Sequence, residues 1–420
     1  MYSEKLAYIS FDIFPSSKGA ATHIAAFSQG LTQAFGKMYL VTISPENIIE
    51  NSLINQTKND SFGIINLQLP AIGETLIHRV LYFRRRLMEW LKDKRFKTIH
   101  IRSPFEGFAI ALDKNKYCQQ LIFEVNGLPS IELKYRYPRV VDDKELLHKL
   151  YAQEQICLKN ADLIITPSKV TSEYLKTRDI AESKIKVIPN GVDLNIFTYK
   201  QRKNQEHNKQ HNKQQLNTLT NDSFNDEVTY SPDYRMIYFG TLSSWQGVNL
   251  TVEALALLNR EISVHLTIIG QAKNYQIQTL EKLAAKLKVT EKITILNGVS
   301  QTELVKHIHS ADLVLAPLTA SDLNLIQGCC PLKVIEAMAT GIPVIASDLP
   351  VVSCLGNNEE HFLLVKPGSA KSIKDAVTRL YTNKGFAENL AINARQQIEN
   401  KYTWNIASEA LINAYKELGI

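Results

Sequence analysis

Short apolar runs alternate with amphipathic stretches along most of the chain. Leu6 to Phe11 is typical of a strand, and the following segment from Ala20 to about Phe35 has apolar residues at helical spacing. Helical stretches separate four further predicted strands, at Met38 to Ile43, Thr98 to Ile101, Leu121 to Val125 and Asp162 to Thr166. This alternation predicts an α/β fold with an open, mostly parallel sheet.

The second half of the chain repeats the pattern. Asp312 to Pro317 predicts a strand, a polar loop follows, and we expect Pro331 at the first position of a helix that runs through Ala339. Gly341 ends that helix, and Val344 to Ala346 predicts the next strand. The order strand, loop, helix, strand is that of a parallel crossover unit.

Such a unit places the helix N-terminus at the carboxyl edge of the sheet, where free amides and the helix dipole attract phosphate. Glu336 stands one and a half turns into this helix. A carboxylate there can accept hydrogen bonds from two ribose hydroxyls while the helix start faces a diphosphate. The unit is therefore a candidate nucleotide site.

Two other segments have a definite pattern. Ile185 to Phe197 contains Asn190-Gly191, which we interpret as a turn because both residue types tolerate positive φ. Met236 to Leu257 predicts a strand, a turn at Gly240 and an amphipathic helix.

Together these segments resemble the family-4 retaining glycosyltransferases of the GT-B fold. The family's usual pattern is Glu, seven residues, Glu, with Phe-Gly-Leu between, and here Glu336 and Leu332 match. Gly328 stands where the first Glu is usual, and Cys330-Pro331 replaces the Phe-Gly pair. The carboxylate that normally touches the donor sugar is therefore missing.

The resemblance covers nearly the whole chain and implies two Rossmann-like doubly wound domains facing each other across a cleft. Residues 1–190 would be the acceptor-side domain, 231–400 the nucleotide-sugar domain, and 401–420 a C-terminal helix packing back on the first domain. Between 199 and 230, 11 of 32 residues are Asn or Gln, so we expect a disordered insertion at the domain junction.

By resemblance, the reaction is transfer of a hexosyl unit from a nucleotide-diphosphate donor, a UDP- or GDP-sugar, to a carbohydrate or lipid-linked acceptor. It would proceed with retention, in polysaccharide or glycolipid synthesis, without a metal or other cofactor. Thr241 and Gln246 stand where an Arg and a Lys usually neutralise the diphosphate. Lys333, in the first turn of the helix, is our candidate replacement, the alternative being a solvent-facing lysine, and Lys18 competes with it.

The family's sugar-contacting His would fall at Asn126, which can hydrogen-bond a hydroxyl but cannot exchange a proton near neutral pH. We expect the neighbouring Glu124 to point elsewhere. In the first loop the family has paired glycines, whereas here Gly19 stands alone, so a plain turn is an open alternative. With Glu336, the resemblance implies a donor site formed by Gly19, Gly240, Thr241, Gln246, Gly270, Val299, Cys330, Pro331 and Leu332.

Composition narrows the class of protein. Of the 420 residues, 45% are hydrophobic, which is enough to build the hydrophobic cores of two domains. Five cysteines without metal-ligand spacing favour a reducing cytoplasm, and His207 and His211 lack the carboxylate partner that a metal pair needs. No apolar run reaches the length of a membrane span.

Positive charge is concentrated between residues 75 and 99, where five Arg and three Lys stand against Glu89 and Asp93. Apolar residues are interleaved, so this segment is either an amphipathic helix lying on an anionic membrane surface or a helix packed on the sheet with a solvated basic face. The first alternative would place the protein at the inner face of the membrane. No nucleic-acid-binding module is visible.

Three hypotheses follow for function. The leading one is an active retaining glycosyltransferase. The second is a sugar-nucleotide epimerase of the same fold, which the missing carboxylate at Gly328 would allow. The third is a non-catalytic protein that binds a nucleotide sugar, or a partner, without transfer.

Overall fold

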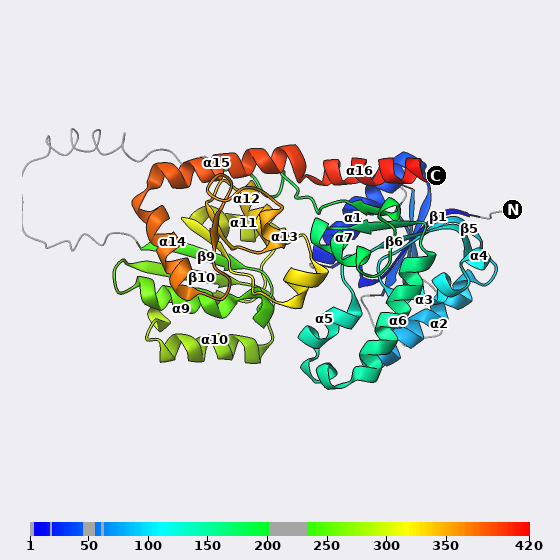
Figure 1. The fold of residues 1–420 in the computed structure, drawn as a ribbon, viewed down its shortest axis with the longest axis horizontal. Helices are drawn as coiled ribbons and strands as arrows, with labels where there is room; N and C mark the ends of the chain where they lie inside the picture. The colour runs from blue at the N-terminus through cyan, green and yellow to red at the C-terminus, as the bar shows by residue number, and fades with distance from the viewer. Residues whose placement is uncertain (1–3, 17–18, 45–54, 60–62, 201–232) are drawn as a thin grey trace, which may run out of the picture.

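The computed structural model describes residues 4–16, 19–44, 55–59, 63–200 and 233–420. These residues form two α/β domains, each a sheet covered by helices on both faces, joined side by side (Figure 1). Lys18 and nearly all of the Asn- and Gln-rich tract, with His207 and His211, lie outside the described residues.

The N-terminal domain contains an eight-stranded sheet. Its order is β3 (Asn55–Asn59), β4 (Ile64–Leu69), β2 (Met38–Ile43), β1 (Glu4–Ile13), β5 (Phe96–Ile101), β6 (Cys118–Glu124), β7 (Leu163–Thr166), β8 (Ile185–Val187). Neighbouring strands are parallel except β3 and β4, which are antiparallel. The helices are α1 (Gly19–Phe35), α2 (Leu76–Leu91), α3 (Pro104–Leu112), α4 (Lys114–Tyr117), α5 (Pro129–Arg136), α6 (Lys144–Asn160) and α7 (Lys169–Lys176).

The C-terminal domain contains a six-stranded parallel sheet. Its order is β11 (Ile293–Leu296), β10 (Val264–Ile269), β9 (Tyr234–Phe239), β12 (Leu313–Ala316), β13 (Val344–Ser347), β14 (Leu363–Val365). The helices are α9 (Val248–Leu258), α10 (Asn274–Lys286), α11 (Gln301–Ser310), α12 (Leu332–Ala339), α13 (Pro350–Ser353), α14 (Ala370–Thr382), α15 (Lys384–Lys401) and α16 (Trp404–Glu417).

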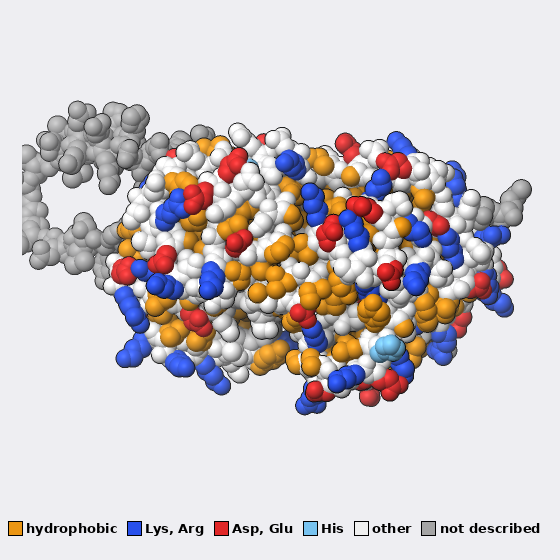
Figure 2. All heavy atoms as spheres, viewed as in Figure 1, with side chains coloured by type: hydrophobic (Ala, Val, Ile, Leu, Met, Phe, Trp, Pro, Cys, Tyr) orange, Lys and Arg blue, Asp and Glu red, His pale blue; other side chains and the backbone are white. Residues whose placement is uncertain are grey.

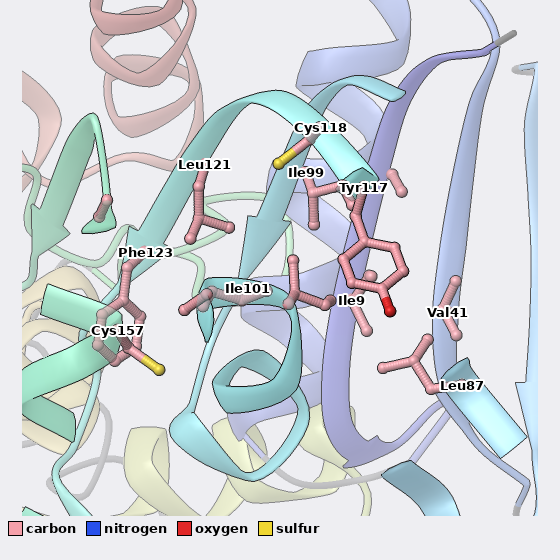
Figure 3. Packing of buried hydrophobic residues seen from close by; sticks show 14 of the residues in the cluster. Ile9, Val41, Leu87, Ile99, Ile101, Tyr117, Cys118, Leu121, Phe123 and Cys157 are labelled. Atoms are coloured by element: carbon pink, nitrogen blue, oxygen red, sulfur yellow. The ribbon is translucent and has the colours of Figure 1, made fainter. Parts of the chain in front are cut away.

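The core of the N-terminal domain fills the space between the sheet and helices α2, α3 and α6. Ile9, Ile101 and Phe123 come from the neighbouring strands β1, β5 and β6, and they pack with Leu87 of α2 and Cys157 of α6 (Figure 3). All five side chains are fully buried. Strands covered on both faces read as continuous apolar runs, which is why the sequence pattern located them.

The last helix, α16, leaves the C-terminal domain and packs on the N-terminal one (Figure 1). Leu411 and Tyr415 on its buried face share a hydrophobic cluster with Tyr8 and Phe27. The first domain is therefore completed by the end of the chain.

The start of α12 differs from the sequence expectation. Pro331 is the N-cap residue, with φ −71° and ψ 101°, and the helix begins at Leu332. The extended ψ keeps Pro331 outside the helix. Lys333 is nevertheless in the first turn.

The turn interpretation of Asn190-Gly191 is wrong. Neither residue has a positive φ. The linker after β8 runs beside the crossing into α16, with the Val192 amide donating to the Tyr402 carbonyl at 2.8 Å. A Cβ at Gly191 would lie 2.3 Å from the backbone nitrogen of Trp404, so close approach of two backbones, and not a turn, requires glycine.

Candidate functional site

The strands β9 and β10 end in loops that pack backbone against backbone at the edge of the sheet facing the cleft. Gly240 has a φ of +124°, and its amide donates to the Ile269 carbonyl at 2.9 Å. The Gly270 amide donates to the Leu296 carbonyl at 3.1 Å, and a Cβ at Gly270 would lie 1.9 Å from the Gly240 oxygen. Two of the predicted donor-site glycines are therefore in direct contact.

Lys333 reaches this glycine turn from beneath. A Cβ at Gly240 would lie 3.2 Å from the Lys333 Nζ, which donates to the Tyr238 hydroxyl at 3.0 Å and lies 4.2 Å from the centre of its ring. The hydroxyl in turn donates to the Thr241 carbonyl at 2.7 Å. Lys333 is buried, so it is not a solvent-facing lysine.

The charge of Lys333 is only partly compensated. Burial lowers the pKa of the Lys333 ammonium to about 7, although the Glu336 carboxylate opposes this shift. Burial likewise raises the pKa of Glu336 to about 7 against the influence of Lys333. Both groups therefore titrate near neutrality, and strongly shifted pKa values of this kind are enriched at functional sites.

Glu336 opens on a cavity of about 570 Å³ between the domains. The cavity is bounded by α1, by the linker residues 191–197, by Gln301 at the start of α11 and by the start of α16. A volume of this size is in the range of small-molecule sites. Val299, half-buried, lies two residues before Gln301 in the loop after β11.

The start of α1 meets the start of α12 across the cleft. A Cβ at Gly19 would lie 2.7 Å from Leu332 Cδ1, so the absence of a side chain at Gly19 permits this approach. Cys330, just before α12, is buried and its carbonyl accepts a hydrogen bond from the Asn190 side chain. The structure thus brings Gly19, Cys330, Pro331 and Leu332 to one place.

Thr241 and Gln246 differ in their surroundings. Thr241 is exposed beside Gly240, whereas Gln246 is buried in the turn before α9. Within the described chain, the Gln246 Oε1 atom has no hydrogen-bond partner. Neither residue supplies the positive charge that the resembling family has at these places.

As the sequence predicted, Glu124 points elsewhere, into the interior of the domain, where it is 1% exposed. Its Oε1 atom accepts a hydrogen bond from the Asn126 side chain and another from Arg102 Nε at 3.0 Å. The other oxygen accepts from the Tyr8 hydroxyl at 2.8 Å. Burial opposes the charge, but His23 and Arg102 outweigh it and hold the pKa of Glu124 well below its usual range. In the sequence, this group of polar side chains was indicated only by Glu124, a charged residue at the end of an apolar strand.

A second cavity, of about 290 Å³, lies at the carboxyl ends of β1, β5 and β6. Asn126 lines it together with Arg102 and the carboxylate of Asp12, which is 44% exposed and accepts from Arg102 Nη1 at 2.8 Å. Asp12 and Arg102 were not recognised in the sequence because the strands that place them together are far apart in the chain. The cavity offers both donors and acceptors to a polar ligand.

The basic segment is a helix only as far as Leu91, and its last residues belong to β5. Arg84 is not free: it donates to the carbonyls of Pro104 and Phe105 at 3.0 Å and to Gln153 at 3.2 Å. Arg85 remains exposed.

In the described part of the chain, no helix is both long and apolar enough to span a membrane. The residues that the structure describes also contain no group of three or more His, Cys, Asp or Glu side chains that could hold a metal ion.

Comparisons with known proteins agree with this architecture. Residues 17–196 match the model of Glycosyltransferase Family 4, and residues 220–397 match that of Glycosyl transferases group 1. An uncharacterized glycosyltransferase of Methanocaldococcus jannaschii is 26% identical over 284 residues, which cover 66% of this chain and 64% of that protein.

Two solved structures superpose along almost the whole chain. Sucrose-phosphate synthase from Thermosynechococcus elongatus has a TM-score of 0.76 at 18% identity, with 99% of both chains covered. Anabaena HepE in complex with UDP has a TM-score of 0.70 at 13% identity, covering 98% of this chain and 100% of that one. At these identities the likeness establishes the fold, and the two family models that cover both domains establish the relationship: the chain belongs to the family-4 glycosyltransferases of the GT-B fold.

Proposed function

We propose that the protein transfers a hexosyl unit from a UDP-sugar, or less favourably a GDP-sugar, to an acceptor hydroxyl with retention, in polysaccharide or glycolipid synthesis. The observation that carries the proposal is the position of Glu336, half-buried and lining the interdomain cavity three residues after Lys333. The UDP bound to the similar HepE structure favours a uridine nucleotide.

In this proposal each element of the C-terminal domain binds one part of the donor. The ionised Glu336 accepts hydrogen bonds from the ribose hydroxyls, and the first amides of α12 face the diphosphate. Lys333, placed under Gly240, stabilises the negative charge that grows on the leaving diphosphate. Because this cation and the amides are preorganised, we propose that transfer needs no metal.

The N-terminal domain contributes the acceptor side. We assign the 290 Å³ cavity to the acceptor, where Asp12 accepts a hydrogen bond from an acceptor hydroxyl and Asn126 contacts the donor sugar. Asn126 is held in place by Glu124, so its amide orientation is defined before substrate binds.

We also propose that α2 touches an anionic membrane surface. Its outer face combines the exposed apolar residues Ile77 and Leu81 with the exposed Arg85. Figure 2 shows hydrophobic side chains gathered in the middle of this face of the molecule, near the junction of the two domains, and Lys and Arg side chains scattered over both domains. An amphipathic helix of this kind binds lipid through apolar area and charge together.

The test is incubation of purified protein with a panel of radiolabelled nucleotide sugars and candidate acceptors, with release of nucleotide as the readout. We expect release from one UDP-sugar that depends on acceptor, and an α-linked product from an α-linked donor by NMR. Epimerised nucleotide sugar without transfer would replace this proposal by an epimerase, and binding without turnover by a non-catalytic role.

A further inference from the structure

Gln327 belongs to the C-terminal domain, in the loop that leads into α12, but its buried side chain is bonded to the N-terminal domain. Its Oε1 accepts a hydrogen bond from the Leu128 amide at 2.9 Å, and its Nε2 donates to Oε1 of Glu132 at 3.0 Å. Because a backbone amide can only donate, the orientation of the Gln327 side chain is defined. Gln327 therefore holds the Glu132 carboxylate from across the domain junction.

Glu132 stands in the first turn of α5, and its carboxylate packs against the backbone of Gly127. A Cβ at Gly127 would lie 2.0 Å from Oε1 and 2.6 Å from Oε2 of Glu132. The absence of a side chain at Gly127 thus provides the space that the carboxylate occupies. Glu132 is therefore a neighbour of Asn126, and both residues line the 290 Å³ cavity.

The Glu132 carboxylate retains an oxygen that can accept a hydrogen bond from a ligand. Among the residues that the structure describes, no cation forms an ion pair with Glu132, and only its Oε1 accepts a hydrogen bond. The residue is exposed where it lines the cavity. The second carboxylate at this cavity, that of Asp12, is already bonded to Arg102 and to the Ser10 hydroxyl.

The position that follows Gln327 cannot carry a carboxylate itself. Gly328 has a φ of +78°, and a Cβ there would lie 2.7 Å from the Thr171 amide nitrogen and 2.8 Å from the Ser168 Oγ. The start of α7 thus fills the space into which a side chain at Gly328 would extend. Packing excludes a carboxylate at this point of the loop, whereas Glu132 presents one beside the same loop.

The cavity that contains Glu132 reaches the place where α1 meets α12. Ala20 lines the cavity, and a Cβ at the preceding Gly19 would lie 2.7 Å from Leu332 Cδ1. In the proposed function, the first amides of α12 face the diphosphate of the donor. A sugar attached to that diphosphate is then next to the cavity that Asn126 and Glu132 line.

We propose that Glu132 binds the sugar of the nucleotide donor, with its Oε2 accepting a hydrogen bond from a sugar hydroxyl while Gln327 holds Oε1. This role rests on the proposed function. Hydroxyl groups are hydrogen-bond donors, and a carboxylate binds them more strongly than a neutral oxygen does. Glu132 then contributes to the affinity for the sugar and not to the affinity for the nucleotide.

Glu132→Gln tests this role, because the variant reverses the polarity of one hydrogen bond. Gln327 Nε2 donates to Oε1 at position 132, so the amide oxygen of the new side chain takes that place and its nitrogen faces the cavity. A donor then replaces the acceptor that the sugar hydroxyl needs. Glu281→Gln, at an exposed position of α10, is the matched control.

Isothermal titration calorimetry with UDP, UDP-glucose, UDP-galactose and UDP-N-acetylglucosamine measures the effect. We expect Glu132→Gln to weaken binding of the UDP-sugar that the wild type prefers by about ten- to a hundredfold, the effect of a lost charge-assisted hydrogen bond. Affinity for UDP should stay at the wild-type value, which also shows that the variant is folded. Glu281→Gln should bind all four compounds as wild type does.

A crystal structure of the wild-type protein with the preferred UDP-sugar checks the contact without a variant. We expect a sugar hydroxyl within hydrogen-bond distance of Glu132 Oε2. A sugar bound away from Glu132 would overturn the proposal, and so would equal weakening of UDP and UDP-sugar by Glu132→Gln, which would indicate a structural role.

The wild-type titrations separate this inference from the proposed function. If the wild type binds neither UDP nor any of the UDP-sugars, the assignment of the nucleotide is wrong and the role of Glu132 is wrong with it. If the wild type binds UDP and Glu132→Gln binds the UDP-sugars as tightly as wild type does, the assignment of the nucleotide stands and only the role of Glu132 is wrong.

Discussion

At the residue scale, two neighbouring groups in α12 titrate near neutrality and should shape nucleotide binding in opposite directions. The pKa of Glu336 is raised to about 7, so its carboxylate is ionised above that pH, and the pKa of Lys333 is lowered to about 7, so its ammonium is charged below it. The proposed site needs both charges. We expect UDP to bind most tightly near neutral pH in isothermal titration calorimetry.

Glu336→Gln should weaken UDP binding by about ten- to a hundredfold, because charge-assisted hydrogen bonds to ribose hydroxyls contribute about 1.5–3 kcal/mol. It should also remove the loss of affinity below neutral pH. Glu281→Gln, an exposed position in α10, is the matched control and should leave affinity unchanged. Equal UDP affinity for Glu336→Gln and wild type would exclude the ribose role.

Lys333 should reduce the stability of the fold, as a buried cation usually does. The folded pKa of about 7 lies below the ordinary value of 10.5, so between these pH values the unfolded chain binds more protons and wild-type stability rises with pH. Lys333→Met should lack this rise and should be more stable than wild type at pH 7 by about 1–3 kcal/mol. Urea unfolding at about pH 7 and pH 9.5 measures both effects.

The same variant should bind UDP more weakly, because the diphosphate loses its cation. Lys286→Gln at an exposed position of α10 serves as the control for charge alone. If Lys333→Met destabilises the protein at pH 7 and leaves UDP affinity intact, the lysine is a structural residue and the role at the diphosphate is wrong.

At the element scale, the sequence predicted those elements whose patterns are local. Strands β2 and β13 and helices α1 and α12 were located within a residue or two, because both faces of the strands are buried and the helices have apolar residues at helical spacing. Strand β4 was not predicted, although Asn66 and Gln68 alternate with its buried apolar residues as in a half-buried strand. The linker turn was misread because the reason for Gly191 is a backbone from a distant segment.

Helix α2 shows that the sequence pattern also does not tell which charged side chains are free at the surface. The sequence groups Arg84 with Arg85, but Arg84 ties α2 to the start of α3 and to α6. We expect Arg84→Gln to lower stability by about 1–2 kcal/mol through lost hydrogen bonds, measured by urea unfolding. Arg85→Gln should leave stability unchanged.

Membrane contact by α2 should depend on the exposed residues alone. Arg85→Gln combined with Leu81→Ser should reduce sedimentation with anionic vesicles, and wild-type sedimentation should fall as salt rises. Lys286→Gln, in the other domain, should sediment as wild type does. Wild-type protein that ignores anionic vesicles at low salt would leave α2 as a solvated helix face.

At the scale of the whole molecule, the fold could be predicted because motifs from both halves of the chain follow one another in the order that the resembling family has. The site was predicted less fully. Lys333, Glu336 and Leu332 share one helix and could be found together, whereas Asp12 and Glu124 meet only through strand order. The burial of Lys333 could not be predicted from its neighbours in the sequence, because its side chain lies beneath a loop some ninety residues away in the chain.

Because α16 packs on the N-terminal domain, the stability of that domain should depend on the last helix of the chain. The hydroxyl of Tyr415 lies 2.6 Å from Nδ1 of the buried His100, and His100 Nε2 lies 3.1 Å from Glu124. The ring of Tyr415 is fully buried and stacks on Phe35 with centroids 5.5 Å apart. The last helix thus supplies both apolar area and a hydrogen bond to the core of the first domain.

Two substitutions separate these contributions. Tyr415→Phe keeps the ring and removes the hydrogen-bond partner of the buried His100 Nδ1, so it should cost about 1–3 kcal/mol in urea unfolding. Tyr415→Ala also empties the ring site and should cost about 3–5 kcal/mol. Because Tyr415 lies far from the nucleotide-facing residues, folded Tyr415→Phe should bind UDP with near wild-type affinity. Equal stability of Tyr415→Ala and wild type would mean that α16 does not complete the N-terminal domain in solution.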